Sequence, residues 1–330
     1  MERLKIGTWR GLVYMIVALA GGVGGAKVAD GLYRTVAPDE LTIVVNTGDD
    51  FDLYGLRISP DADTVLYTLA GLANSETGWG IAGDTFATLE MLRRYGEDTW
   101  FLLGDHDFAT HIQRTRWLRE GKSPTEVASA LATALGVRAR LLPMCDTSVA
   151  THVRTPEGEL AFQDYFVRRH HSDEVLGIRF AGIETAGPSE QVRVALAEAD
   201  VIVFCPSNPL VSIGPILAVP GMRDLVRAAR APRVAISPII AGKALRGPAD
   251  RMLAGLGDEV SAFGVARLYT NLLDGIIIDQ EDAALAGRIG DELHLRVHIT
   301  DTVMHTGEDR LRLADETLQF AQRLGAERIV

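Results

Sequence analysis

A run of glycines stands where a short apolar segment ends. Residues 14–20 (YMIVALA) are too few to cross a membrane and are typical of a buried strand. The glycine turn, residues 21–25, follows, and residues 26–36 have the composition of a helix. Glycines let the backbone approach a phosphate closely, and the free N–H groups at a helix start attract anions. The pattern predicts a phosphate site, with a plain tight turn as the alternative, because the spacing matches no standard nucleotide motif. Its expected residues are Gly21, Gly22, Gly24, Gly25 and Lys27.

Carboxylates follow the next apolar run. Residues 41–46 (LTIVVN) predict a second buried strand, and Asp49 and Asp50 come directly after it. Ser59-Pro60 then predicts a helix start with Asp61 and Asp63 in its first turn, where they could also serve only as caps. Aspartates clustered without Cys or His favour a hard cation, Mg²⁺ before Zn²⁺.

A third polar group ends a later strand. Residues 200–205 (DVIVFC) predict a buried strand that leads into Pro206-Ser207-Asn208-Pro209. A rigid Ser-Asn pair can offer a hydroxyl, an amide and backbone N–H groups to a nucleotide. Ligands of parallel sheets bind at the carboxyl ends of strands, so we expect Ser207 and Asn208 near the glycine turn and the acidic residues.

These groups require a particular fold to bring them together. The sequence predicts an α/β, Rossmann-like, mostly parallel doubly wound sheet in which residues 14–20, 41–46, 200–205 and 233–237 are neighbouring central strands. We expect one nucleotide-binding domain over residues 15–330 and an N-terminal extension over residues 1–14. Shorter strands are expected at 275–278 and 295–299, and a closing helix at 311–324.

Two insertions are expected in this sheet. A helical insert, about residues 61–135, would contain helices over 85–95, 106–120 and from Ser123, with Asp84 as the cap of the first and Ser123-Pro-Thr-Glu as a capping box. A small antiparallel insert, about residues 138–184, would begin with RARLLPM and contain a hairpin at Glu157-Gly158. His170 and His171 are expected in an exposed turn.

Charge and composition limit the classes of partner. The net charge of −11 argues against nucleic acid and anionic membranes, which require a basic face. Two cysteines, Cys145 and Cys205, without metal-type spacing suit a reducing cytoplasm. Residues 12–20 superficially resemble a signal peptide, but cleavage there would remove the strand before the glycine turn.

Taken together, the blocks of this sequence resemble one family, the 2-phospho-L-lactate transferases of deazaflavin coenzyme (coenzyme F-420) biosynthesis. The resemblance runs in order from Met15 to the C-terminus. The matching blocks are GGVGGAK (21–27), VVNTGDD (44–50), ISPDADT (58–64), WGIAGDTF (79–86), LGDHDFATHI (103–112), LLPMCD (141–146), FQDYFV (162–167), PSNPLVSIGPIL (206–217), SPIIAGKALRGPAD (237–250) and TDTVM (300–304).

The resemblance implies a reaction and its partners. A phospholactyl group, or a relative such as phosphoenolpyruvyl, passes from a GMP-activated donor to the terminal ribityl hydroxyl of FO, the deazaflavin 7,8-didemethyl-8-hydroxy-5-deazariboflavin. GMP leaves, and Mg²⁺ is required. The family gives no reason to expect nucleic-acid or membrane partners, and it leaves a homodimer open.

The resemblance also implies roles for single residues. Asp49 and Asp63 are expected to be catalytic, and Asp49, Asp50 and Asp63 to hold Mg²⁺. The donor would contact the glycine turn, Lys27, Asn46, Ser207 and Asn208. The FO pocket would contain Asp63, Trp79, Asp84, Thr85, Leu102, Asp105 and His111.

Two other functions compete with this one. A non-catalytic, Rossmann-like regulator that binds a nucleotide sugar would share the fold and the glycine turn, but it would carry a Gly- and Ser-rich stretch where this chain has NTGDDFD and SPDADT. A dehydrogenase could use Asp49 at the end of the second strand, but the turn lacks the G-x-G-x-x-G spacing.

Overall fold

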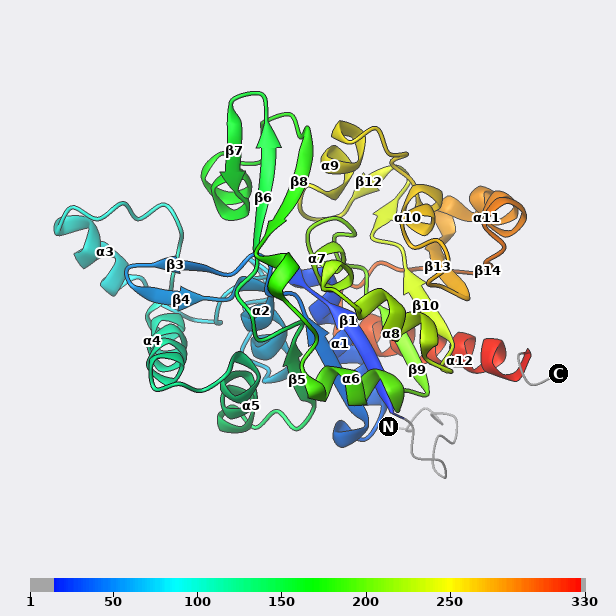
Figure 1. The fold of residues 1–330 in the computed structure, drawn as a ribbon, viewed down its shortest axis with the longest axis horizontal. Helices are drawn as coiled ribbons and strands as arrows, with labels where there is room; N and C mark the ends of the chain where they lie inside the picture. The colour runs from blue at the N-terminus through cyan, green and yellow to red at the C-terminus, as the bar shows by residue number, and fades with distance from the viewer. Residues whose placement is uncertain (1–14, 328–330) are drawn as a thin grey trace.

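The computed structural model describes residues 15–327, and a seven-stranded parallel sheet runs through its centre (Figure 1). The N-terminal extension predicted for residues 1–14 lies outside the described residues. The strand order is β14-β13-β10-β9-β1-β2-β5. The strands are β1 (Ile16–Ala20), β2 (Leu41–Val45), β5 (Arg140–Pro143), β9 (Val201–Phe204), β10 (Arg233–Ile236), β13 (Gly275–Asp279) and β14 (Arg296–Thr300).

The four strands predicted as central neighbours are neighbours. β1 pairs in parallel with β2 on one side and with β9 on the other, and β10 follows β9. The chain first builds outward from β1 through β2 to β5, and then in the opposite direction from β9 to β14. The carboxyl ends of β1 and β9 therefore form the switch point, which is where open α/β sheets bind their ligands.

Helices cover both faces of the sheet because its central strands are buried on both sides. One layer contains α1 (Gly22–Thr35), α2 (Pro60–Leu69), α5 (Pro124–Ala134) and α12 (Gly307–Glu327), with α1 packed against both α2 and α12. The other contains α6 (Glu190–Ala197), α7 (Ile213–Ala218), α8 (Met222–Ala228), α10 (Ala262–Leu268) and α11 (Ala286–Leu293). Within residues 15–327, no helix is both long enough and apolar enough to cross a membrane.

The first helix begins earlier than predicted. α1 starts at Gly22 rather than at Ala26, so the glycines form its first turn and not a loop ahead of it. Gly21 is the N-cap residue, and no side chain caps the helix from that position. Glycine has a low helix propensity, so the sequence did not predict a helix over these residues. Gly22 has a positive φ (+59°), a conformation that glycine adopts readily.

Two groups of smaller elements extend from the sheet (Figure 1). One comprises the hairpin β3 (Phe51–Leu53) and β4 (Leu56–Ile58) with the helices α3 (Ala87–Arg94) and α4 (Asp105–Arg119). The other is the antiparallel sheet β7-β6-β8, with β6 (Ala150–Thr155), β7 (Gly158–Ala161) and β8 (Gly177–Ala181). The remaining elements are β11 (Ile239–Ile240), β12 (Lys243–Ala244), α9 (Ala249–Gly255), the 3₁₀ segments Pro38–Glu40, Ile183–Thr185 and Gln280–Leu285, and the π-helical segment Asp164–Arg168.

Two predictions about these insertions are wrong. RARLLPM is not part of the antiparallel insert, because β5 pairs in parallel with β2 and extends the central sheet. Asp84 does not cap α3, whose N-cap is Phe86. The Glu157-Gly158 hairpin and the Ser123 capping box are confirmed.

Candidate active site

The predicted nucleotide-binding loop closes directly onto the glycine turn. Ser207, just beyond β9, accepts a hydrogen bond from the Gly21 N–H (3.0 Å) and donates one to the Gly21 carbonyl (2.7 Å). Asn208 accepts hydrogen bonds from the N–H groups of Leu210 and Val211 and so shapes the turn that follows. The switch point thus joins the two segments that sequence reasoning assigned to the donor.

The glycines are required by close packing of the protein itself. A Cβ on Gly24 would lie 2.3 Å from the Pro206 carbonyl oxygen, and one on Gly25 would lie 2.4 Å from Ser207 Oγ. Both distances are far shorter than van der Waals contact. Because glycine has no side chain, these two positions let α1 approach the 205–209 segment closely. Protein atoms therefore fill the space beside Gly24 and Gly25, where the sequence suggested that a phosphate could lie.

A carboxylate already lies at the N-terminus of α1. Asp61 accepts a hydrogen bond from the Gly22 N–H, and a Cβ on Gly21 would lie 2.2 Å from Asp61 Oδ2. Asn46 links this carboxylate to the acidic residues after β2, because its amide nitrogen donates to Asp61 Oδ2 (2.9 Å) and to Asp49 Oδ1 (3.0 Å). Asn46 is therefore the centre of a carboxylate pair, which we call the Asp49–Asp61 pair.

Burial makes this pair costly in its charged form. Asp49 and Asp61 are 6% and 7% exposed. Burial raises the pKa of Asp49 well above its usual value, and the neighbouring Asp61 and Asp50 raise it further. Burial also raises the pKa of Asp61, although hydrogen bonds from Asn46 and Ser212 oppose this. Two buried carboxylates without an ion-paired base need either a proton or a cation.

Beside the pair, Asp50 faces a cavity of about 550 Å³. The cavity lies between α2, α4, α5 and the ends of β2 and β5, and its apolar wall includes Leu66, Val127, Leu131 and Leu141. Two buried polar atoms in its lining, Asp50 Oδ1 and Thr47 Oγ1, have no hydrogen-bond partner within residues 15–327. Burial raises the pKa of Asp50 to about 7, opposed by Arg57 and the Ser59 hydroxyl. A ligand of this cavity could bond to both atoms.

Asp63 is held by an arginine on α4. Arg114 Nη1 donates to Asp63 Oδ2 (3.0 Å), and Arg114 Nη2 donates to the other carboxylate oxygen. His111 lies between Asp63 and Asp107, with Nδ1 3.7 Å from the first carboxylate and Nε2 3.2 Å from the second. Tyr67 donates its hydroxyl to Asp107 (2.6 Å). Asp63 is therefore neutralised inside a buried network.

The predicted trio Asp49, Asp50 and Asp63 does not bring three ligand atoms within 4.8 Å of one another in the described residues. Within residues 15–327, the set of three such side chains whose ligand atoms lie within 4.8 Å of one another is Asp63, Asp107 and His111. Arg114 already supplies a positive charge to that set, so a divalent ion would be repelled there. Among Asp49, Asp50, Asp61 and Asp63, the two that make no ion pair within residues 15–327 are those of the Asp49–Asp61 pair.

The residues predicted for FO do not line the 550 Å³ cavity, with the exception of Asp63. Trp79 and Leu102 are 41% and 46% exposed, and His111 is fully buried in the Asp63 network.

Asp84 and Asp105 belong to helix starts. Asp84 accepts from the N–H groups of His106 and Asp107 at the start of α4, and Asp105 accepts from those of Ala87 and Thr88 at the start of α3. Thr85 donates its hydroxyl to Asp105. These contacts within the protein explain the positions of the Asp84, Thr85 and Asp105 side chains, with no bound ligand required.

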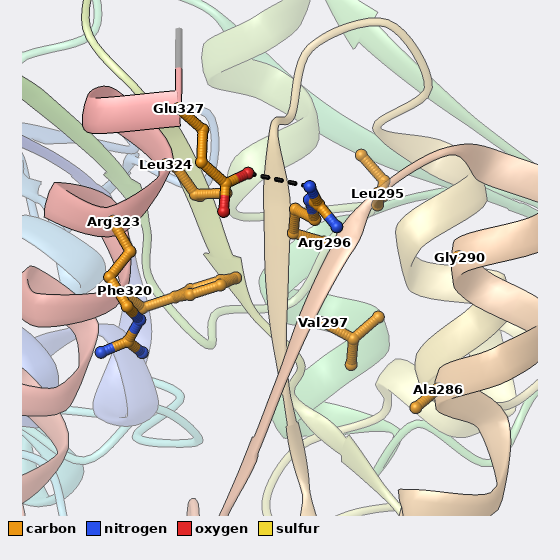
Figure 2. A pocket seen from close by; sticks show the side chains of 9 residues that line it. All are labelled: Ala286, Gly290, Leu295, Arg296, Val297, Phe320, Arg323, Leu324 and Glu327. Atoms are coloured by element: carbon orange, nitrogen blue, oxygen red, sulfur yellow. Dashed lines mark ion pairs between the residues drawn. The ribbon is translucent and has the colours of Figure 1, made fainter. Parts of the chain in front are cut away.

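Another hollow lies at the amino ends of the strands (Figure 2). Its lining includes Leu295, Arg296 and Phe320, with an ion pair of 3.0 Å between Arg296 and Glu327, and its volume is about 300 Å³. It holds none of the site residues described above. Because parallel sheets place their ligand sites at the carboxyl ends, we assign it no part in the chemistry.

Sequence reasoning missed the importance of Asp61, Thr47 and Arg114. Residues two apart on a helix do not share a face, so Asp61 turns toward α1 while Asp63 turns toward α4. The spacing of Asp107, His111 and Arg114, at i, i+4 and i+7, was the available signal for a shared buried face of α4.

Comparison with known proteins decides the family. The sequence model of the family described as 2-phospho-L-lactate transferase CofD matches residues 16–308. The chain belongs to this family. A phosphoenolpyruvate transferase from Kitasatospora aureofaciens is 49% identical over 274 residues, which cover 81% of this chain and 85% of that protein. A 2-phospho-L-lactate transferase from Methanosarcina acetivorans is 40% identical over 300 residues, covering 91% and 97%.

A solved structure has a similar fold. A UPF0052-family protein from Bacillus halodurans superposes with a TM-score of 0.64, covering 93% of this chain and all of that one. At 16% identity this similarity concerns the fold alone.

Proposed function

We propose that this chain transfers a phospholactyl-type group, either phospholactate or phosphoenolpyruvate, from a GMP-activated donor to the ribityl hydroxyl of FO. Family membership and the names of its relatives support a transferase of this class. The observation that carries the proposal is the position of Asp50, which stands between the Asp49–Asp61 pair and the 550 Å³ cavity with an unpartnered oxygen. Donor and acceptor would meet at this residue.

On the donor side, the start of α1 and the 205–209 segment would bind the nucleotide and its phosphates. The N–H groups of the first helical turn beyond Gly22, and the helix dipole, favour anions. Asp61 shares this helix end, so the donor phosphates would lie next to a buried carboxylate. Their mutual repulsion must be offset for the donor to bind.

Mg²⁺ fits this requirement. The Asp49–Asp61 pair offers carboxylate oxygens, the ligands that hard cations prefer, and no basic side chain is ion-paired to either residue among those described. Asp49 and Asp61 would hold the ion, with Asp50 beside them. Bound there, Mg²⁺ would neutralise the carboxylates and polarise the phosphoryl oxygens.

On the acceptor side, the cavity would take the deazaflavin. Its 550 Å³ lies within the usual range for small-molecule sites, and its apolar wall suits an aromatic ring system. Asp50 would accept the proton of the ribityl hydroxyl as that oxygen bonds to phosphorus and the bond from phosphorus to GMP breaks. A pKa of about 7 in the metal-free protein, lowered by a neighbouring Mg²⁺, would leave this base ionised near neutral pH. Asp63 and Arg114 would then shape the cavity wall.

Filling the cavity tests this assignment. Ala128 lines the cavity from α5, whereas the neighbouring Ser129 is exposed on the same helix. Ala128→Trp should raise the KM for FO at least about tenfold and leave GDP binding, measured by calorimetry, within about twofold of the wild type. Ser129→Trp is the matched control and should change neither value. Unchanged FO kinetics in a folded Ala128→Trp protein would place the acceptor elsewhere.

We further propose a cytoplasmic enzyme, since Cys145 and Cys205 are both free thiols. A homodimer is compatible with this proposal.

A further inference from the structure

Two cationic side chains beside the start of α1 lack an acidic partner. Lys27 Nζ donates to the Met304 carbonyl (2.6 Å), and Arg246 Nη1 donates to the Thr77 carbonyl (2.7 Å). Neither side chain makes an ion pair with a carboxylate in the described part of the chain. Some other arginines, by contrast, make ion pairs, as Arg233 does with Asp274. Asp309 attracts Lys27 only from beyond ion-pair distance, and Arg246 is exposed, so neither cation has a carboxylate paired with it within residues 15–327.

Arg246 reaches the first turn of α1 from a distant part of the chain. It follows the β11–β12 hairpin and lies against Gly78, in the segment between α2 and α3. A Cβ on Gly78 would lie 2.1 Å from Arg246 Nη1 and 3.4 Å from Val23 Cγ1. Val23 belongs to the first turn of α1, and Lys27 lies one turn later on the same face. Arg246, Val23 and Lys27 are thus neighbours.

The two cations repel each other. Partial burial lowers the pKa of Lys27, the nearby Arg310 and Arg246 lower it further, and Asp309 opposes them. The N-terminus of α1 adds a positive partial charge to the same region. A chain with a net charge of −11 has abundant acidic residues, yet none of those described is paired with these two cations. An anionic ligand would supply the missing charge.

We propose that Arg246 is a donor-binding residue that, together with Lys27, holds an oxyanion of the activated donor. This inference rests on the proposed function. Arg246 uses one of its five N–H donors on Thr77, and the remaining donors can bind an oxyanion in the bidentate manner typical of arginine. The donor offers two such groups, its phosphates and the carboxylate of the three-carbon acid.

The substitution Arg246→Gln separates charge from local structure. The glutamine amide could still donate to the Thr77 carbonyl and hold the two segments together, but it would carry no charge. Arg246→Lys keeps the positive charge but loses the guanidinium group, which can donate two parallel hydrogen bonds to one oxyanion. Arg251→Gln is the matched control, because Arg251 is also exposed and donates to one carbonyl, that of His171, at 3.3 Å.

The measurements are the calorimetric Kd of GDP in the presence of Mg²⁺ and the steady-state KM of the GMP-activated donor. If Arg246 holds the phosphates, Arg246→Gln raises both the GDP Kd and the donor KM about tenfold or more, as expected for a charge-assisted hydrogen bond. If it holds the carboxylate, the donor KM rises in the same way while the GDP Kd stays within about twofold of the wild type. Arg246→Lys should fall between Arg246→Gln and the wild type.

Two other results would contradict the inference. If Arg246→Gln matches Arg251→Gln in both GDP Kd and donor KM, Arg246 only links two segments, and the proposed function stands without it. If the wild-type protein neither binds GDP nor turns over the donor, the proposed function fails and this inference fails with it.

Discussion

Gly22 donates its N–H to the carboxylate of Asp61, so a side chain of the protein occupies the helix end that the sequence assigns to phosphate. A phosphate at the same end would meet a negative charge about one hydrogen bond away. The donor can bind there only if Asp61 is protonated or shares a cation with the phosphate. This relationship makes nucleotide affinity depend on Mg²⁺ and on Asp61 together.

Exchange of Asp61 for Asn should therefore separate binding from turnover. Without Mg²⁺, and at a pH high enough to ionise Asp61 in the wild type, Asp61→Asn should bind GDP about tenfold more tightly than the wild type, because the repulsion is gone. Turnover with Mg²⁺ should fall at least about a hundredfold if a metal ligand is lost. Calorimetry with and without Mg²⁺ measures the first effect, and Asp39→Asn, at an exposed ion pair, is the control. Weaker GDP binding in the absence of metal would show that Asp61 supports the phosphates instead.

Asp50 should set the pH dependence of the reaction. Its pKa is about 7 in the metal-free protein and a neighbouring Mg²⁺ would lower it, so kcat/KM should rise with pH through a midpoint at or below about 7 and then level off, since a general base acts only when deprotonated. Asp50→Asn should remove this rise and lower kcat at least about a hundredfold. A variant that keeps both the rise and the rate would assign the base to another residue.

Raising the pH through about 7 should increase the activity that depends on Asp50 but decrease the stability of the fold. A folded-state pKa raised above the unfolded value of 3.8 means that Asp50 favours folding in its protonated form, and this contribution is lost as pH rises through about 7. The metal-free protein should consequently have a higher melting temperature at pH 6 than at pH 8. Asp50→Asn should raise the melting temperature at pH 8, measured by calorimetry without Mg²⁺. A lower melting temperature there would refute the burial argument.

The sequence predicted the positions of strands better than the contacts of side chains. Continuous apolar runs identified β1, β2, β9 and β10 as central strands, and the rule that ligands lie at carboxyl ends brought Gly21 and Ser207 together correctly. The start of α1 was missed because glycine has low helix propensity, although tertiary packing against Pro206 requires it.

Side-chain partners far apart in the sequence could not be predicted in this way. Nothing near Asp63 indicated that Arg114, 51 residues later, would bind both of its oxygens. The sequence leaves open whether Asp61 serves only as a cap of its own helix, and in the structure it bonds to the start of α1. Such contacts depend on how the helices pack, and the spacing of residues along the chain does not determine that packing.

The Asp63–Arg114 pair changes what Asp63→Asn is expected to do. From the sequence alone, the exchange should spare folding; in the structure it leaves a buried guanidinium without its counter-charge. We expect a loss of about 3–5 kcal/mol in the free energy of unfolding, the usual effect of breaking a buried ion pair. The double variant Asp63→Asn, Arg114→Met should recover much of that loss. If turnover returns with stability, Asp63 acts only through the fold; if it stays low, Asp63 also contributes to the reaction.

Asp84, which precedes α3, and Asp105, the first residue of α4, each bind backbone N–H groups at the start of the other segment's helix, and this arrangement gives a test of the predicted FO contacts. Asp84 accepts N–H groups at the start of α4, where it also lies 3.0 Å from His106 Nδ1, and Asp105 accepts those at the start of α3. Asp84→Ala should lower the free energy of unfolding by about 1 kcal/mol, the usual effect of losing an N-cap.

Asp84→Asn should be milder than Asp84→Ala, because the amide oxygen can still accept a backbone hydrogen bond. Both variants should retain the wild-type KM for FO once they are assayed well below their melting temperatures. Urea unfolding and steady-state kinetics on the same preparations measure the two effects. If the KM for FO rises about tenfold in Asp84→Asn with little change in stability, Asp84 contacts FO. The FO site would then not be the cavity beside Asp50.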